Sequence, residues 1–234
     1  MRPSNQATEQ LSNLQILYED EALLFINKPP NIVVQRGYDP DEPVLLELAK
    51  AHAGTLFLLQ RLDRGTSGVI FFSKSADINP RLTRQFETKR IRKRYLALCE
   101  GELAESQTVD APLARIGPIS FGVRDHGKRS VTSVRPLRAT PNGSLVSIDL
   151  QTGRTHQIRV HLAAIGHPII GDWLYGKRNA PRPMLHAAEL ALLHPSTNAP
   201  LRVIAPLPED FLEVAEERKI MSRSEDIMTA AECS

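Results

Sequence analysis

Apolar residues recur along the chain in short runs that are separated by polar and glycine- or proline-containing turns. Runs of roughly four to eight residues rich in aliphatic and aromatic side chains are typical of β-strands. These runs predict strands at Leu14–Tyr18, Leu23–Asn27, Leu56–Gln60, Val69–Phe72, Tyr95–Cys99, Ser130–Leu137, Leu145–Leu150, Met184–Leu192 and Leu201–Ile204.

Fewer segments have the spacing of apolar residues that is typical of an amphipathic helix. They predict helices at Val44–Ala51, at about Asp77–Lys89, at about Thr155–Ile165 and from near Pro208 onward. The strands outnumber the helices and do not alternate with them as in repeated βαβ units. This order favours an α+β fold with a mixed, largely antiparallel central sheet and flanking helices.

The helix expected from Thr155 has the best-defined ends, with Thr155 as the N-cap and Gly166 as the stop signal. Arg159 lies next to the apolar stripe of this helix. A rigid helix can aim such a side chain into a cleft instead of leaving it in solvent, so Arg159 is a candidate functional residue. The apolar stripe itself consists of Ile158, Leu162 and Ile165.

Composition is that of an ordinary globular protein, with 234 residues, 41% hydrophobic and 24% charged. The two cysteines can form neither a disulfide framework nor a zinc site, and no apolar run is long enough for a membrane span or a signal peptide. We therefore expect a cytoplasmic protein that does not enter a membrane. The working domain is expected at 14–212, between a polar tail at 1–13 and a charged helix or tail at 213–234.

The net charge of +2 conceals an uneven distribution, because the acidic tail offsets a basic body. Seven basic residues crowd positions 81–94 against one acid, Glu87. Such a run is either the solvated face of a helix or a surface that binds a polyanion. The basic residues are Arg81, Arg84, Lys89, Arg90, Arg92, Lys93 and Arg94.

The segment 58–68 lies between two expected strands, and its glycines, Gly65 and Gly68, permit sharp turns. Asp63 sits on this loop between two arginines, which favour a charged carboxylate that can act as a nucleophile or base. An aspartate in a loop can equally form an Asx-turn that only shapes the backbone. The loop alone does not decide between these two roles.

The same loop resembles the Arg-Leu-Asp-x-x-Thr-Ser-Gly signature of the RluA family of RNA pseudouridine synthases. The signature is matched by Arg61, Leu62, Asp63, Thr66, Ser67 and Gly68. Other segments resemble family motifs in the expected order: Asn27–Pro29 with Val33 and Val34, Lys93–Ala97, Gly153–His161, Gly166–Asp172, Tyr175–Gly176, Leu185–Ala187 and His194–Pro195. The resemblance covers roughly residues 16–210 and implies a pseudouridine synthase fold with a catalytic cleft.

Two positions depart from the family pattern. Gln60 stands where the family usually has histidine, and Gly65 stands where it often has aspartate. Neither departure removes a residue assigned to the reaction, so we expect them to bear on the fit to flanking nucleotides. About 13 residues precede the first expected strand, and we expect the form of the family without an amino-terminal S4 domain.

The resemblance implies a role for each of four site residues. Asp63 would be the catalytic residue, and Arg159 would pair with it and fix its orientation. Tyr95 would stack on the target uracil, whereas without the resemblance it would be an ordinary half-buried strand tyrosine. Arg61 would enter the space left when the nucleotide flips out.

The resemblance also implies the partner, a structured ribosomal or transfer RNA stem-loop, which a monomer would bind without a metal or cofactor. The histidines lack a metal-binding pattern, so we interpret them as structural or RNA-facing. Two other functions remain open, a catalytically silent RNA-binding protein and a hydrolase that releases free uracil. The residues expected to contact RNA are Arg84, Lys89, Arg90, Arg92, Lys93 and Arg94.

Overall fold

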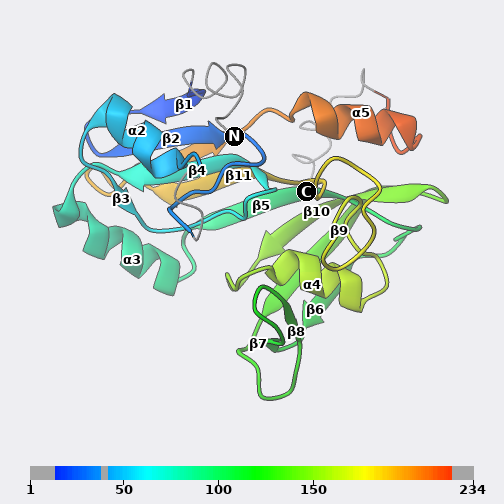
Figure 1. Ribbon diagram of the computed structural model, residues 1–234. Coiled ribbons are helices and arrows are strands. Elements are labelled where there is room, and N and C mark those ends of the chain that lie inside the picture. Colours follow the sequence, from blue (N-terminus) through cyan, green and yellow to red (C-terminus); the bar gives the residue numbers. More distant parts are fainter. Residues whose placement is uncertain (1–13, 38–41, 223–234) are drawn as a thin grey trace. The chain divides into compact units, whose positions relative to one another are not determined.

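The computed structural model describes residues 14–37 and 42–222, which form two compact units (Figure 1). The first unit contains the described residues up to Arg92 together with Glu189–Pro206. The second contains Lys93–Ala188 together with the described residues from Leu207 onward. The pairs β1–β2, β2–β4, β3–β4, β5–β10, β9–β10, β6–β9, β7–β8 and β11–β12 run antiparallel, and an isolated parallel bridge joins Val33 to Val44, which agrees with the expected α+β class and its largely antiparallel sheet.

The first unit is built on the neighbouring strands β1, β2 and β4. The strands expected in this part of the chain are confirmed, although the one expected at Leu56–Gln60 is only two residues long. The elements are β1 (Ile16–Glu19), β2 (Leu23–Lys28), α2 (Leu45–Ala53), β3 (Phe57–Leu58), β4 (Ser67–Ser73), the 3₁₀ helix η1 (Ala76–Ile78), α3 (Asn79–Glu87) and β12 (Pro200–Ile204).

The core of the first unit lies around β2 and β4. Phe25 is paired with Phe71 across the two strands, and their rings stack with centroids 5.3 Å apart. Phe71 also stacks on Phe86 of α3, at 6.2 Å. Every residue of β4 is buried, because side chains cover both faces of this strand. A strand that is buried on both faces needs apolar side chains at successive positions, which explains the continuous apolar run of β4.

Helix α3 is fixed by side chains that bond to backbone groups of a distant segment. The Gln85 amide donates to the carbonyl of Leu193 at 2.7 Å and accepts from its N–H at 2.9 Å. Leu193 ends β11 (Leu185–Leu193), a strand that runs from the second unit into the first. The helix expected at 77–89 is shorter than predicted because a 3₁₀ turn precedes it and Lys89 (φ 55°) turns the chain after Glu87.

The second unit has β10 between β5 and β9, with β6 beyond β9. The expected strands at 95–99, 130–137 and 145–150 are confirmed, whereas β6, β7 and β8 were not predicted. The elements are β5 (Arg92–Cys99, whose first residue belongs to the first unit), β6 (Gln107–Asp110), β7 (Leu113–Arg115), β8 (Phe121–Val123), β9 (Val131–Thr140), β10 (Gly143–Leu150), α4 (Gln157–Ala164) and α5 (Glu209–Glu217).

Helix α4 is anchored to β9 by two buried polar side chains. Gln157 donates to the carbonyl of Val131 at 3.0 Å and to the Thr132 hydroxyl at 2.9 Å. His161 bonds the same hydroxyl through Nδ1 at 2.8 Å and the carbonyl of Ala111 through Nε2 at 2.9 Å. Burial lowers the pKa of His161, so its imidazole is neutral and structural, as expected for the histidines of this chain.

Helix α5 begins with an ion pair in which Arg182 binds Asp210 through Nε at 2.6 Å and Nη2 at 2.8 Å. The domain boundary expected at 212 falls inside this helix, which continues to Glu217. The tail expected at 1–13 and most of the one expected at 213–234 lie outside the described residues. In segments 14–37 and 42–222 there is no helix of the length and hydropathy that a bilayer crossing requires.

Candidate active site

The loop between β3 and β4 carries Asp63, whose side chain is half-buried. Leu62 is buried beside it and anchors the loop to the core. The N–H of Thr66 donates to the carbonyl of Asp63 at 3.1 Å, which closes a tight turn directly after the carboxylate. Of the two glycines, Gly68 has a left-handed φ of 110°, which favours glycine, while Gly65 does not.

Lys28 fixes this loop from β2. It is fully buried, and its ammonium donates to the carbonyls of Pro29 at 2.9 Å and Arg64 at 3.1 Å. The register pairs Lys28 with Gly68, so the ammonium lies where the loop joins β4. The sequence assigned Lys28 no role, although a lysine at the end of the apolar run 23–28 is a signal for a buried charge.

The two arginines that flank Asp63 differ in their surroundings. Arg61 is exposed. Arg64 Nη1 lies 3.5 Å from Oε1 of Glu42, whose side chain is 8% exposed. A second carboxylate besides Asp63 therefore lies close to the arginines of the loop. The amide nitrogen of Gln60 is buried and, among the described residues, has no hydrogen-bond partner. The position that departs from the family pattern therefore presents an unsatisfied donor next to the loop.

Arg159 is buried in the second unit and is held rigidly. Its Nε and Nη2 each donate to a carboxylate oxygen of Asp172 at 2.7 Å, and the Asp172 side chain is fully buried. Because Gln157 and His161 fix the other side of α4, Arg159 cannot move without the helix. The expectation that the helix holds Arg159 out of solvent is confirmed, and Asp172 is a partner that the sequence did not identify.

The start of α4 differs from the prediction. Thr155 is exposed, and the N-cap is His156, which has a left-handed φ of 57° and makes no capping side-chain bond. Its ring instead bonds the Tyr175 hydroxyl through Nδ1 at 2.8 Å. The helix ends at Ala164 with Ile165 as C-cap, and Gly166 (φ 86°) follows as the expected stop signal. A side-chain contact with Tyr175 thus replaces the threonine cap as the feature that defines this helix start.

The predicted site residues are divided between the two units. Asp63 and Arg61 belong to the first unit, while Tyr95 and Arg159 belong to the second. Tyr95 is 7% exposed on β5, where it is paired with Ile148 of β10. The pairing of Asp63 with Arg159 and the position of Tyr95 facing Asp63 stay predictions.

The basic residues at 84–94 are divided between exposed and half-buried positions. Arg84, Lys89, Arg90 and Arg92 are exposed, while Lys93 and Arg94 are half-buried. Burial lowers the pKa of Lys93 to about 8. This lysine therefore loses its charge closer to neutral pH than an ordinary surface lysine.

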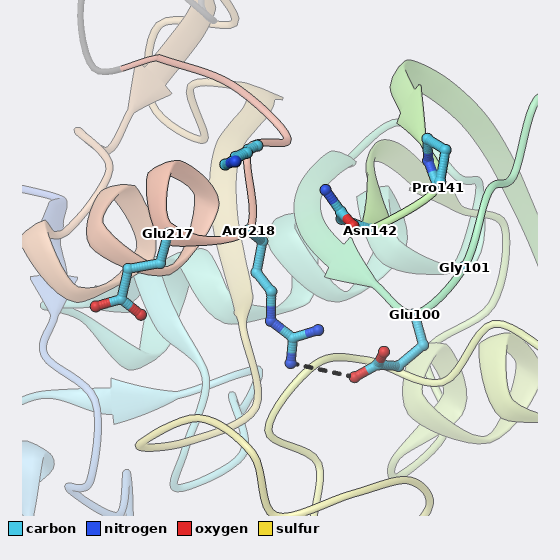
Figure 2. Close-up of a pocket in the computed structure, with 7 residues that line it drawn as sticks. Glu100, Gly101, Pro141, Asn142, Glu217 and Arg218 are labelled. Carbon is cyan, nitrogen blue, oxygen red and sulfur yellow. Dashed lines mark ion pairs between the residues drawn. The ribbon is translucent and has the colours of Figure 1, made fainter.

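A pocket of about 480 Å³ in the second unit is lined by residues outside the predicted site (Figure 2). In it Arg218 points toward Glu100, with 3.7 Å between Nη2 and Oε1. Across the described ranges, no cluster of three or more histidine, cysteine, aspartate or glutamate side chains could hold a metal ion. The pocket is lined by Glu100, Gly101, Pro141, Asn142, Glu217, Arg218 and Lys219.

Comparison with known families identifies the class of protein. The sequence model of the family described as RNA pseudouridylate synthase matches residues 22–164, a stretch that includes Asp63, Tyr95 and Arg159. The chain belongs to this family, whose members are isomerases that act on RNA.

Several curated proteins that resemble the chain are named ribosomal large subunit pseudouridine synthase D. The one from Nitrosomonas europaea is 37% identical, over 85% of this chain and 63% of that protein. Those from Haemophilus influenzae and Xanthomonas campestris are each 34% identical, over 86% and 99% of this chain and 69% and 76% of theirs. The chain thus spans somewhat under two thirds of the length of the first of these relatives.

Solved structures that resemble the fold include two human proteins. Human RNA Pseudouridylate Synthase Domain Containing 4 matches with a TM-score of 0.75 at 24% identity, covering 94% of this chain and 100% of that one. Human RNA Pseudouridylate Synthase Domain Containing 1 matches with a TM-score of 0.68 at 24% identity, covering 92% and 98%. The expected pseudouridine synthase fold is confirmed.

Proposed function

We propose that this protein converts uridine to pseudouridine in ribosomal RNA, with Asp63 as the catalytic residue. The observation that carries the proposal is the family match over residues 22–164, in which the signature loop is intact. The names of the similar proteins favour RNA of the large ribosomal subunit over transfer RNA. The cytoplasm, a monomeric state and a compact stem-loop as target form part of the same proposal.

The reaction breaks the N1–C1′ glycosidic bond, turns the uracil and rejoins it through C5, from which a proton is then lost. No net oxidation or reduction occurs. In this scheme Asp63 either attacks C1′ or removes a ribose proton, and either route releases the uracil for recapture. Glycosidases generally use two carboxylates, one as acid and one as nucleophile or base. The signature loop offers one, which fits a reaction that retains its leaving group.

Positioning of Asp63 is the contribution that we assign to its neighbours. The Lys28 ammonium ties the Arg64 carbonyl of the loop to the Pro29 carbonyl after β2, which favours a fixed carboxylate. Arg159 would orient Asp63 from the second unit. The bidentate bond to Asp172 fixes the plane of the Arg159 guanidinium for this role.

Two further residues would act on the substrate itself. The Tyr95 ring would stack on the uracil, with its hydroxyl placed to handle the proton at C5. Arg61, which is exposed on the loop, would fill the space of the flipped nucleotide. Gln60, which stands where the family usually has histidine, would bear on the fit to the neighbouring nucleotides.

The basic residues at 84–94 would bind phosphates of the RNA. The exposed members are suited to this because their charges are free to approach the backbone of a polyanion. We expect the Kd for RNA to rise steeply with salt concentration, and replacement of Arg84 and Arg90 by glutamine to reduce the slope of log Kd against log salt. An unchanged slope would assign these residues to a solvated face instead.

The test uses purified protein and large-subunit ribosomal RNA transcribed without modification. Nucleoside mass spectrometry should detect pseudouridine after incubation with the wild type and none after incubation with Asp63→Asn. Asp77→Asn, an exposed aspartate of η1, is the matched control and should retain full activity. Free uracil would instead indicate a hydrolase, and RNA binding without a product would indicate a silent binding protein.

A further inference from the structure

The β7–β8 hairpin is a small two-stranded sheet of its own within the second unit. In Figure 1 it projects beyond α4. Its tip is exposed, with Ile116 at 50% and Ile119 at 54% exposure, and Arg115 lies over the Phe121 ring at 5.7 Å. An exposed arm with an apolar tip and a basic stem can contact RNA bases and phosphates.

Tyr175 connects this hairpin to α4. The backbone N–H of Phe121, the first residue of β8, donates to the Tyr175 hydroxyl at 2.9 Å. The same hydroxyl bonds Nδ1 of His156, the N-cap of α4, at 2.8 Å. The His156 ring packs edge-on against both Phe121 and Tyr175, with centroids 5.8 and 5.6 Å away. The hydroxyl therefore joins three chain segments.

Tyr175 also contacts the Arg159–Asp172 pair directly. The Arg159 guanidinium carbon lies 5.1 Å from the centroid of the Tyr175 ring, within the range of a cation–π contact. The backbone N–H of Tyr175 donates to Asp172 Oδ1 at 3.3 Å. That oxygen also accepts from Arg159 Nη2. A displacement of Tyr175 would act on both members of the pair.

We propose that Tyr175 is a positioning residue that couples the β7–β8 hairpin to Arg159, so that RNA contact at the hairpin aligns the guanidinium. The inference rests on the proposed function, in which Arg159 orients Asp63. The hydroxyl accepts the hydrogen bond from the backbone N–H of Phe121 and is hydrogen-bonded to His156 Nδ1. Tyr175 acts through Arg159 and does not touch the substrate.

Tyr175→Phe is the variant that tests this coupling. It removes the hydroxyl and keeps the ring under Arg159. Tyr18→Phe is the matched control, because the Tyr18 hydroxyl donates to Asp20 at 2.6 Å in the first unit and lies outside the Arg159 network. With unmodified large-subunit ribosomal RNA, Tyr175→Phe should lower kcat about tenfold with KM within about twofold, and Tyr18→Phe should change neither. Equal kcat in the two variants would overturn the proposal.

Hydrogen exchange separates the coupling from the activity. In the wild type, RNA should slow amide exchange both in the hairpin at 113–123 and in the segment 172–176. In Tyr175→Phe, RNA should still protect the hairpin but no longer protect 172–176. The same protection of 172–176 in both proteins would refute the coupling. This measurement requires only RNA binding, so it decides the matter even if the wild type forms no pseudouridine and the proposed function fails.

Discussion

Asp172→Asn tests whether the buried pair with Arg159 holds the second unit together. Asp172 accepts two hydrogen bonds from Arg159, both at 2.7 Å, and two from the backbone N–H groups of Leu174 and Tyr175, at 3.1 and 3.3 Å. Asparagine has the shape of aspartate, but one carboxylate oxygen becomes an NH₂ group. That group then faces an N–H donor of Arg159 instead of accepting a hydrogen bond from it. The variant also removes the negative charge of Asp172 from beside the buried Arg159 guanidinium.

The magnitude follows from burial, because the side chains of Arg159 and Asp172 are 8% and 0% exposed. Breaking a buried ion pair on one side costs about 3–5 kcal/mol. For a chain of this length each kcal/mol lowers Tm by about 2–4 °C, so a fall of roughly 6–20 °C is expected. The double variant Arg159→Met, Asp172→Leu should recover part of this loss, because it removes both charges together.

Glu47→Gln is the matched control. Glu47 also binds an arginine through both of its oxygens, with Arg36 Nη2 at 2.6 and 2.7 Å, but the two side chains are 55% and 45% exposed. An exposed pair of this kind contributes at most about 1 kcal/mol. Thermal and urea unfolding followed by circular dichroism compares the two variants. If Asp172→Asn loses no more stability than Glu47→Gln, the assignment of a stabilising role to the buried pair is wrong.

Three further variants test other parts of the molecule. Lys28→Met should lower the free energy of unfolding in urea by about 1–3 kcal/mol and reduce kcat, because the carbonyls of Pro29 and of Arg64 in the loop lose their donor; unchanged values of both would remove Lys28 from the site. Lys93 has its pKa lowered to about 8, so wild-type affinity for RNA in a filter-binding assay should fall between pH 7 and 9 as the ammonium loses its proton. Lys93→Arg stays charged and should show a smaller fall, whereas equal falls would exclude Lys93 as the titrating group. Gly171→Ala should yield little folded protein on gel filtration, because at φ 81° its Cβ would overlap the carbonyl of Arg182; a stable, active variant would contradict this.

The strands that the sequence predicts are those with long aliphatic runs. Most residues of β2, β4 and β10 are buried, and buried positions require apolar side chains. The apolar runs in the sequence therefore reveal these strands. β6, β7 and β8 were not predicted because each has only three or four residues and few of them are buried. β6 pairs with β9, where Gln107 lies opposite Val134, and a local pattern does not record a partner that distant in the chain.

The candidate site shows the same limit. Asp63 and Arg159 stand out through motif and helix position, which are local properties of the sequence. Lys28, Asp172 and Tyr175 lie within segments that resemble family motifs, but their roles depend on contacts over 13 to 36 residues of chain. Arg159 has many carboxylates available in the sequence, and only the packing of α4 against the segment after Gly171 selects Asp172. Partner choice is a tertiary property.

Pseudouridine mapping in cells that lack this gene is the most direct test of the claim that Asp63 catalyses pseudouridine formation in ribosomal RNA. Deletion should remove pseudouridine from defined positions of the large-subunit RNA. A plasmid copy of the wild type, or of the Asp77→Asn control, should restore them, and a copy with Asp63→Asn, expressed to the same level, should not. Restoration by Asp63→Asn, or a map that deletion leaves unchanged, would contradict the proposed function of this protein.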